Sequence, residues 1–262
     1  MNLNLIIEEV NALSRNVGQF IMTEQDLLTR GDIKEKGLHD YVTHVDKRSE
    51  QMLIKGLSEI IPGSGFLVEE HTVENTMQEY TWVVDPLDGT TNFIHGLPVF
   101  AISIALMKDQ EVIMGSVLDV KAGECFYAVK GGRAFCNEKE IKVSEKQTLA
   151  ESLLATGFPY NDFSRQKEYL EMLAYLMQSC RGIRRYGSAA IDLSWVACGR
   201  FDGFWEYSLK AWDVAAGSFI VEQAGGKCSD FEGGKNFLFG QEIVAGNSGV
   251  YKELQELTGK FF

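Results

Sequence analysis

Two aspartates, Asp85 and Asp88, are the residues of this chain best suited to chemistry. The apolar run 82–84 before them is typical of a buried strand, which is expected to end at Asp85. Two carboxylates at one strand end repel each other unless a cation joins them, and a hard divalent cation does so well. Gly89 then permits a tight turn, and residues 90–92 are of types that begin helices, whose free N–H groups favour a phosphate. The segment therefore predicts a metal and a phosphate at one strand end, the layout of phosphoryl transfer.

Two other carboxylates also lie at the end of a predicted strand or at the start of a predicted helix. Glu69 follows the apolar residues 66–68, and Asp213 directly precedes a helical pattern at 214–224. Such a set offers the hard oxygen donors that two or three Mg²⁺ ions prefer, and metals held in this way can grip a phosphate and activate a water. The predicted ligands are Glu69, Asp85, Asp88, Asp213 and the carbonyl of Leu87.

Each of these residues also has a plainer interpretation. Asp85 and Asp88 could merely cap a turn, although a strand end followed by glycine and two threonines disfavours that interpretation. Glu69 could belong to a solvated acidic turn, and Asp213 could be only the N-cap of its helix, a role compatible with binding a metal through its other oxygen. Asp46, ahead of a second helical pattern, is on the sequence alone more simply explained as a helix cap.

Helices and an antiparallel sheet are expected to position the first carboxylates. Residues 5–22 have apolar residues at three- and four-residue spacing, which predicts an amphipathic helix, and a second helix should stop at the Pro-Gly pair 62–63. Residues 30–45 are polar and predict a loop or an irregular hairpin. From 99 to 143 apolar stretches alternate with turns, which predicts an antiparallel meander.

After this meander, strand-like and helix-like segments alternate, with helices expected at 164–179, 188–199 and 214–224 and near the C-terminus. That alternation implies βαβ units. We therefore expect an N-terminal α+β half, residues 1–147, and a C-terminal α/β half, residues 148–262, that completes the site.

The second half also offers candidates for substrate contact. Ser188 and Ala189 begin a helix with small residues that leave backbone amides approachable. Glu206 lies at a predicted strand end, where a glutamate is usually only a surface residue. Arg184 and Arg185 could balance a second phosphate or pair with the acidic site, and pairing is the simpler interpretation.

Composition narrows the class of protein. Of 262 residues, 45% are hydrophobic, which is enough for a large core, but no apolar run reaches the roughly 18 residues that a membrane span needs, and no signal peptide is evident. Five scattered cysteines without a Cys-x-x-Cys pair favour neither a zinc site nor disulfides and fit a reducing cytoplasm. The net charge of −12 argues against a nucleic-acid partner but not against a small phosphorylated substrate, because bound cations can reverse the local field.

Two motifs resemble the signatures of the inositol monophosphatase family. Residues 85–93 read Asp-Pro-Leu-Asp-Gly-Thr-Thr-Asn-Phe, residues 212–217 read Trp-Asp-Val-Ala-Ala-Gly, and the similarity runs from Lys36 to the final helix. The resemblance implies the αβαβα layered sandwich of the sugar phosphatases and Mg²⁺-dependent hydrolysis of an inositol monophosphate or a similar polyol or sugar phosphate. It also implies a homodimer, a lithium-sensitive superfamily, and a mobile loop at Lys36, although a lone lysine in a charged loop is usually solvated.

The resemblance further implies a role for each metal ligand. Glu69, Asp85 and the Leu87 carbonyl would bind the first metal, and Asp85, Asp88 and Asp213 the second. The family usually has glycine or serine before its Glu-Glu pair. This chain has valine there, which can alter the local turn but not the ligand.

The remaining roles implied by the resemblance concern water and substrate. Glu69 and the Thr90 hydroxyl would orient the attacking water, and Asp46 would hold Thr90. The backbone amides of Gly89 and Thr90 would bind phosphate, and Glu206 would bind sugar hydroxyls. The full set of expected substrate contacts is Asp88, Gly89, Thr90, Ser188, Ala189, Glu206 and Asp213.

Several rival functions stay open. A haloacid-dehalogenase-like phosphatase has a similar motif, but its two carboxylates stand two residues apart, whereas Asp85 and Asp88 stand three apart. Fructose-1,6-bisphosphatase and 3′(2′),5′-bisphosphate nucleotidase belong to the same superfamily, and residues 91–93 favour the inositol branch over them. A regulatory scaffold that retains the fold is the non-enzymatic rival, which the costly cluster of like charges argues against.

Overall fold

The computed structural model describes residues 1–27, 33–37, 40–159 and 162–262. The N-terminal elements are α1 (Leu3–Leu27), β1 (Ile33–Gly37), β2 (Asp40–Thr43), α2 (His44–Ile60), β3 (Gly65–Val68), β4 (Tyr80–Asp88), α3 (Thr90–Ile94), β5 (Ala101–Lys108), β6 (Glu111–Asp119), β7 (Glu124–Val129), β8 (Ala134–Cys136) and β9 (Lys139–Ile141). The C-terminal elements are η2 (Leu149–Glu151), β10 (Leu153–Thr156), α4 (Gln166–Ser179), β11 (Gly182–Arg184), α5 (Ala189–Ala197), β12 (Gly203–Tyr207), α6 (Ala211–Gln223), β13 (Lys227–Ser229), η3 (Asn236–Leu238), β14 (Glu242–Gly246) and α7 (Ser248–Phe261).

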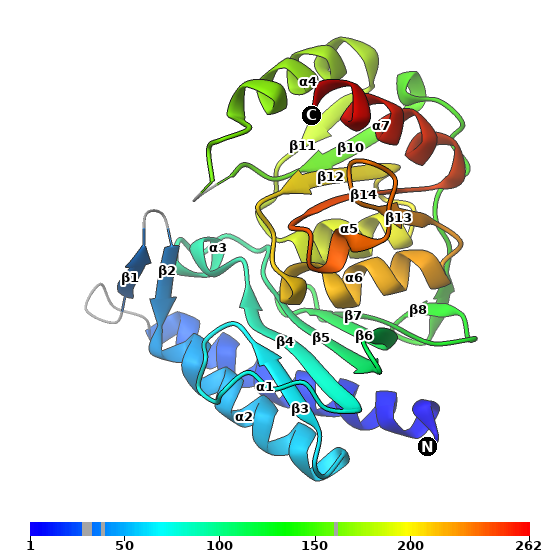
Figure 1. The fold of residues 1–262 in the computed structure, drawn as a ribbon. Coiled ribbons are helices and arrows are strands. Elements are labelled where there is room, and N and C mark those ends of the chain that lie inside the picture. The colour runs from blue at the N-terminus through cyan, green and yellow to red at the C-terminus, as the bar shows by residue number, and fades with distance from the viewer. Residues whose placement is uncertain (28–32, 38–39, 160–161) are drawn as a thin grey trace.

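The larger sheet has the strand order β3-β4-β5-β6-β7-β8-β9. Strand β3 runs parallel to β4, and every later neighbour is antiparallel, so the meander expected between 99 and 143 is confirmed. Helices α1 and α2 cover one face of this sheet, and α5 and α6 lie on the other (Figure 1). Helices α1 and α2 pack on this face because each carries an apolar stripe that it buries against the sheet.

The smaller sheet has the order β11-β10-β12-β14-β13. Strand β10 is parallel to β11 and β12, as the βαβ pattern predicts, but β14 is antiparallel to both β12 and β13. This sheet is therefore mixed. Helices α4 and α7 cover its outer face, which completes the αβαβα sandwich that the resemblance implies (Figure 1).

Three apolar cores separate the five layers. One lies under α1 and α2, a second lies between the two sheets around α5 and α6, and a third lies under α4 and α7. Helices α5 and α6 approach closely because a Cβ on Gly217 would lie only 2.7 Å from the Leu193 Cβ. The middle core contains residues from both expected halves, so the division into 1–147 and 148–262 stays a prediction.

The polar segment 30–45 contains the β1–β2 hairpin, with an irregular register, and Lys36 lies in β1. Residues 28–32 and 38–39, which include part of the expected loop, are outside the described residues. Within the described part of the chain, no helix is both long and apolar enough to cross a bilayer.

Candidate active site

A bulge in β4 brings the two aspartates to the same face of the larger sheet. In a regular strand, residues three apart point to opposite faces. Asp85 pairs with Ser103 of β5 and Asp88 pairs with Ala101, so β4 advances three residues where β5 advances two. Ser103 donates a hydrogen bond to the Trp212 carbonyl of α6, which identifies this face as the one that packs on α5 and α6. The expectation that the strand ends at Asp85 is therefore wrong, because β4 continues through the bulge to Asp88.

Local chemistry stabilises the bulge and the turn after it. The Leu87 amide donates to Asp85 Oδ1 at 2.9 Å, and Pro86 has no N–H that would need a partner. Gly89 has φ of +92°, and a Cβ there would lie 2.9 Å from the Val99 carbonyl oxygen. Only glycine fits this position, and it is the N-cap of α3 in place of the threonine and asparagine side chains that the sequence favours.

The start of α2 reaches the same site through Asp46. Thr43 is the N-cap of α2, and its amide and hydroxyl donate to Asp46 Oδ2 at 2.8 and 2.6 Å. Asp46 is thus the third residue of the helix and closes a capping box, which corrects the expectation that it is the cap itself. Its other oxygen accepts from the Thr90 hydroxyl at 3.0 Å. Burial raises the pKa of Asp46, and the bonds from Thr43 and Thr90 oppose that rise.

A buried glutamate of α2 holds the turn that carries Glu69. Glu50 accepts hydrogen bonds from the amides of Glu70 and Thr72, at 2.7 and 2.8 Å, and from the Thr72 hydroxyl at 2.7 Å. Glu69 stands just after β3, and its carboxyl group lies within hydrogen-bonding reach of Asp85. The acidic pair 69–70 is therefore a supported turn at the site rather than a loose solvated one.

The beginning of α5 binds Asp88. The Ser188 hydroxyl and the Ala190 amide donate to Asp88 Oδ2 at 2.6 and 2.8 Å. Burial raises the pKa of Asp88 to about 6, and these two bonds limit the rise because they favour the ionised form. Asn92 connects α3 to the chain before α5, since its amide group donates to the carbonyls of Val99 and Tyr186 at 2.7 Å each.

Asp213 occupies the third position of α6. Its Oδ2 accepts from the Lys210 amide at 2.6 Å, and Lys210 is the N-cap, so Asp213 supports the helix start without being its cap. Burial first, and then the charge of Asp88, raise the pKa of Asp213 to about 8. The adjacent Trp212 ring meets the His71 ring edge to face, with centroids 6.2 Å apart, which joins α6 to the turn after Glu69.

Glu206, near the end of β12, lies against the backbone of Gly157, which has no side chain. A Cβ on Gly157 would fall 1.9–2.2 Å from the three carboxyl atoms of Glu206, so only glycine leaves room for them. Burial raises the pKa of Glu206 to about 8, and the charge of Arg185 opposes the rise. The Arg185 guanidinium lies 5.5 Å from the Phe158 ring centroid and also faces the buried Asp192. The simpler interpretation of Arg185, pairing with the acidic site, agrees with these neighbours.

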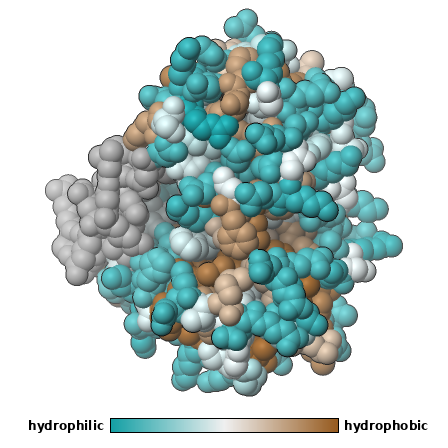
Figure 2. Space-filling model, in the orientation of Figure 1, coloured by the Kyte–Doolittle hydropathy of each residue, from teal (hydrophilic) through white to brown (hydrophobic). Residues whose placement is uncertain are grey.

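Most of the predicted site residues line one cavity of about 440 Å³, whereas Asp46 does not line it and reaches the site through Thr90. Its carboxylates share it with an apolar wall that includes Phe158, Leu209 and Trp212. Figure 2 shows a mostly hydrophilic face on which hydrophobic side chains gather in the middle, where α6 begins beside β4 in Figure 1. The sequence-predicted residues that line the cavity are Glu69, Asp85, Leu87, Asp88, Gly89, Thr90, Ser188, Ala189, Glu206 and Asp213.

The donor set of this cavity fits hard divalent cations in charge and chemistry. Burial, followed by the charges of Glu69, Asp88 and Asp213, raises the pKa of Asp85 well above its usual range. Carboxylates that destabilise one another's charge in this way are stabilised by a cation between them. In the described residues no three acidic, histidine or cysteine side chains already have the spacing of a closed ligand set. Asp88 and Asp213 each give one oxygen to a protein hydrogen bond and keep the other for a ligand.

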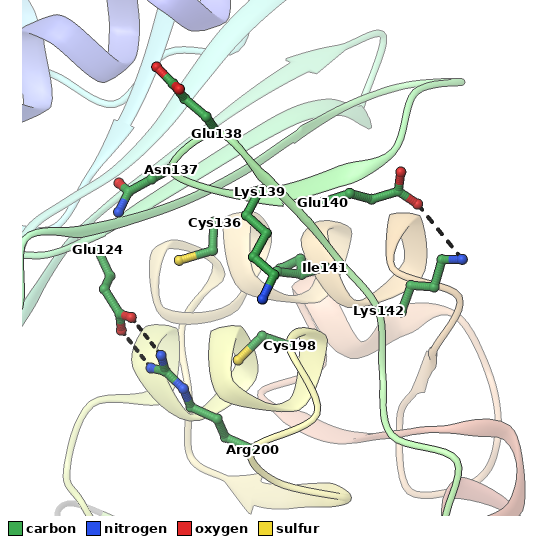
Figure 3. A pocket seen from close by; sticks show the side chains of 10 residues that line it. All are labelled: Glu124, Cys136, Asn137, Glu138, Lys139, Glu140, Ile141, Lys142, Cys198 and Arg200. Carbon is green, nitrogen blue, oxygen red and sulfur yellow. Dashed lines mark hydrogen bonds and ion pairs between the residues drawn. The ribbon is translucent and has the colours of Figure 1, made fainter.

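A larger hollow, of about 980 Å³, lies elsewhere, between strands β7–β9 and the end of α5 (Figure 3). Arg200 and Glu124 close one side of it with two hydrogen bonds of 2.5 Å. Burial raises the pKa of the Cys136 thiol to about 11, so this sulfur stays protonated near neutral pH and is a poor nucleophile or metal ligand. Cavity volume alone therefore does not identify the site, because the predicted site residues line the smaller cavity.

The structure thus brings the predicted ligands together and adds residues that sequence reasoning missed. The missed residues support the site from outside its lining and are Glu50, Gly157 and Asp192; the contacts of Asn92, a residue of the motif, were also not foreseen. Local patterns distinguish them poorly, because partners such as Glu70 for Glu50 and Tyr186 for Asn92 are 20 and 94 residues away in sequence. His44 and His95 are exposed at the surface, and His44 Nε2 lies 3.0 Å from a Glu24 oxygen.

Known proteins resemble this chain along nearly its whole length. The model of the inositol monophosphatase family matches residues 2–260. An inositol-1-monophosphatase of Mesorhizobium japonicum is 37% identical over 98% of this chain and 96% of its own, and the Nus factor SuhB of Pseudomonas aeruginosa is 42% identical over 92% and 91%. The crystal structure of the extragenic suppressor protein SuhB of Bartonella henselae superimposes with a TM-score of 0.93 at 36% identity, covering 98% of this chain and 99% of that one.

The whole-length family match, the matching fold and the carboxylate cavity all point to the same group of proteins. This chain belongs to the inositol monophosphatase family, whose members are metal-dependent phosphatases that act on small phosphorylated substrates.

Proposed function

We propose that this protein is a Mg²⁺-dependent phosphomonoesterase that hydrolyses an inositol monophosphate or a similar small polyol or sugar phosphate. The observation that carries the proposal is the β4 bulge, which turns Asp85 and Asp88 to one face, where they meet Glu69 and Asp213 in a single cavity. A structural turn would need neither the bulge nor four mutually repelling carboxylates.

The metal ligands are proposed from this geometry and from the family. Glu69, Asp85 and the Leu87 carbonyl would hold one ion, and Asp85, Asp88 and Asp213 another, with two or three ions in all. When bound, these ions would neutralise the phosphate and lower the pKa of a water. The buried position of Asp85 between the other carboxylates agrees with its shared role.

Thr90 and Glu69 are the residues proposed to orient the attacking water. Asp46 accepts two hydrogen bonds from Thr43 and one from Thr90, so it serves as an acceptor in every bond that it makes here. The Thr90 hydroxyl proton is directed toward one of two protein acceptors, Asp46 Oδ1 at 3.0 Å or the Leu87 carbonyl at 3.1 Å, and a lone pair of the Thr90 oxygen is left to accept a proton from water. This arrangement aligns the water for direct attack on phosphorus, without a phosphoenzyme.

The other side of the cavity is proposed to bind the ester. The Gly89 and Thr90 amides would receive the phosphate, and Ser188, Ala189 and Glu206 would contact the leaving group. The opening is lined by both carboxylates and aromatic rings, which suits a small ring that carries hydroxyl groups. We further propose that the protein works as a homodimer in the cytoplasm, which light scattering and fractionation would test.

A regulatory role is the second candidate, because relatives that share 40–42% identity with this chain are named Nus factor SuhB. Such a role would not require turnover. The intact carboxylate cavity favours the enzyme, since a scaffold has no use for buried charges that repel one another.

The deciding experiment measures phosphate release with Mg²⁺ and with chelator. The substrates are inositol monophosphates, fructose 1,6-bisphosphate and adenosine 3′,5′-bisphosphate, which separate the inositol branch from its two alternatives. Asp213→Asn should lose the Mg²⁺-dependent rate, and Asp109→Asn, in the exposed β5–β6 turn, is the matched control that should keep it. Absence of Mg²⁺-dependent release on every ester would leave the regulatory role as the better account.

A further inference from the structure

Two non-glycine residues that line the candidate active site have a positive φ, His71 and Ser208, and of these two types serine is the one that this conformation disfavours more. Ser208 has φ of +68°, in the left-handed region that glycine, asparagine and aspartate enter most easily. It lies between the last residue of β12 and the start of α6, half-buried, and it lines the cavity that contains the carboxylates.

The neighbours of Ser208 impose this conformation. On its C-terminal side, the Leu209 amide donates to the Gln241 carbonyl at 3.1 Å and the Leu209 side chain is buried. One residue later, the Lys210 amide is bound by Asp213 at 2.6 Å. On its N-terminal side, Tyr207 pairs with Glu242 of β14. Because both flanks are fixed, residue 208 must make the turn within one residue, and glycine would make it without strain.

Hydrogen bonds within the described part of the fold do not explain why this position carries a serine. Its hydroxyl has no hydrogen-bond partner among residues 1–27, 33–37, 40–159 and 162–262. The cavity wall around it along the chain includes the apolar side chains of Leu209 and Trp212, and the charged residues Glu206 and Lys210 line the cavity two residues to either side. A polar group that is strained, unused by the protein and placed in a binding cavity is a candidate for contact with a ligand.

We propose that Ser208 is a specificity-determining residue, whose hydroxyl forms a hydrogen bond with a hydroxyl group of the substrate's leaving group, beside Glu206. This inference rests on the proposed function, because it requires a polyol ester in the cavity. The hydroxyl of serine can donate and accept, so it complements a ring alcohol that donates to Glu206 and still has lone pairs to offer.

The test compares three variants on two esters at saturating Mg²⁺. Ser208→Ala removes the hydroxyl and keeps the strain, whereas Ser208→Gly removes both. Gln110→Gly is the control, because Gln110 has φ of +69° in the exposed β5–β6 turn, far along the chain from the site. The esters are an inositol monophosphate and p-nitrophenyl phosphate, which has no alcohol groups on its leaving group.

Both Ser208 variants should lose about threefold to tenfold in kcat/KM on inositol monophosphate relative to p-nitrophenyl phosphate, mainly through KM, as expected for one neutral hydrogen bond. Ser208→Gly and Gln110→Gly should each raise Tm by roughly 2–4 °C, and Ser208→Ala should not. Gln110→Gly should leave both activities unchanged.

A Ser208→Gly protein that is more stable and keeps the wild-type ratio of the two activities would overturn the inference, since the strain would then have no use. A wild-type protein that hydrolyses neither ester would overturn the proposed function, and this inference with it. The two failures are distinguishable because the first occurs in an active enzyme.

Discussion

Gly157→Ala should displace Glu206 and mimic the loss of that carboxylate without touching it. The added Cβ would lie 1.9, 2.0 and 2.2 Å from Oε1, Cδ and Oε2 of Glu206. Ordinary van der Waals contact begins near 3.4 Å, so the carboxyl group must retreat by about 1.2–1.5 Å. The backbone of Gly157 accepts alanine, because its φ is not positive, so the change acts on Glu206 rather than on the turn.

A displacement of this size breaks a hydrogen bond of normal length. Loss of one bond between Glu206 and a substrate hydroxyl costs about 1–2 kcal/mol, which predicts a fall of roughly 5- to 30-fold in kcat/KM on inositol monophosphate. The metals and the attacking water lie elsewhere, so p-nitrophenyl phosphate should be hydrolysed at nearly the wild-type rate. Glu206→Gln should give the same pattern, with a loss of about one decade.

The assay is steady-state kinetics on both esters across a Mg²⁺ titration. Gly182→Ala, in β11 of the same sheet, is the matched control, because its Cβ would meet nothing closer than 3.4 Å. The double variant Gly157→Ala/Glu206→Gln should lose no more than the worse single variant, since both changes remove one interaction. Equal losses on both esters, or losses that add in the double variant, would refute the role assigned to Glu206.

Three further results are expected. Asp85→Asn should nearly abolish turnover with the fold intact, because a shared ligand is lost; a rate above roughly a tenth of wild type at saturating Mg²⁺ would contradict this. Millimolar Mg²⁺ should raise the Tm measured with chelator, and Asp213→Asn should reduce the shift; an unchanged wild-type Tm would refute the metal cluster. Burial raises the pKa of Glu206 and Asp213 to about 8 from ordinary values of 4.5 and 3.8, so the folded metal-free protein holds protons that the unfolded chain has released. Its stability should therefore fall as pH rises from about 4 to 8, and a higher Tm at pH 8.5 than at pH 5.5 in chelator would show the sign to be wrong.

The sequence by itself singled out the residues that the structure gathers in one cavity. The motif at 85–93, the Glu after β3 and the Asp at the start of α6 were each recognisable, because strand ends and helix starts leave local signatures. The helices and strands followed from apolar periodicity, which reports which face of an element is buried, whereas the layered αβαβα arrangement was implied by the resemblance to the family. The predicted roles of these residues in metal and substrate binding await the experiments above.

Only the tertiary structure decided how these residues meet. From spacing alone, Asp85 and Asp88 should point to opposite faces of a strand, and the bulge that unites them is visible only in the pairing of β4 with β5. Sequence reasoning also expected the strand to end at Asp85 and treated Asp46 as a cap. Both errors arise because a bulge and a capping box depend on hydrogen bonds to particular partners, which residue types indicate only weakly.

The supporting residues were beyond the reach of local patterns for the same reason. Glu50 holds a turn 20 residues further on, and Gly157, just after β10, leaves space for a carboxylate of β12. The strain at Ser208 exists because β14 and α6 fix the residues around it, a constraint imposed by segments distant in sequence. Residue types report a local preference, whereas position, burial and strain arise from contacts between distant segments, and these contacts form only when the chain has folded.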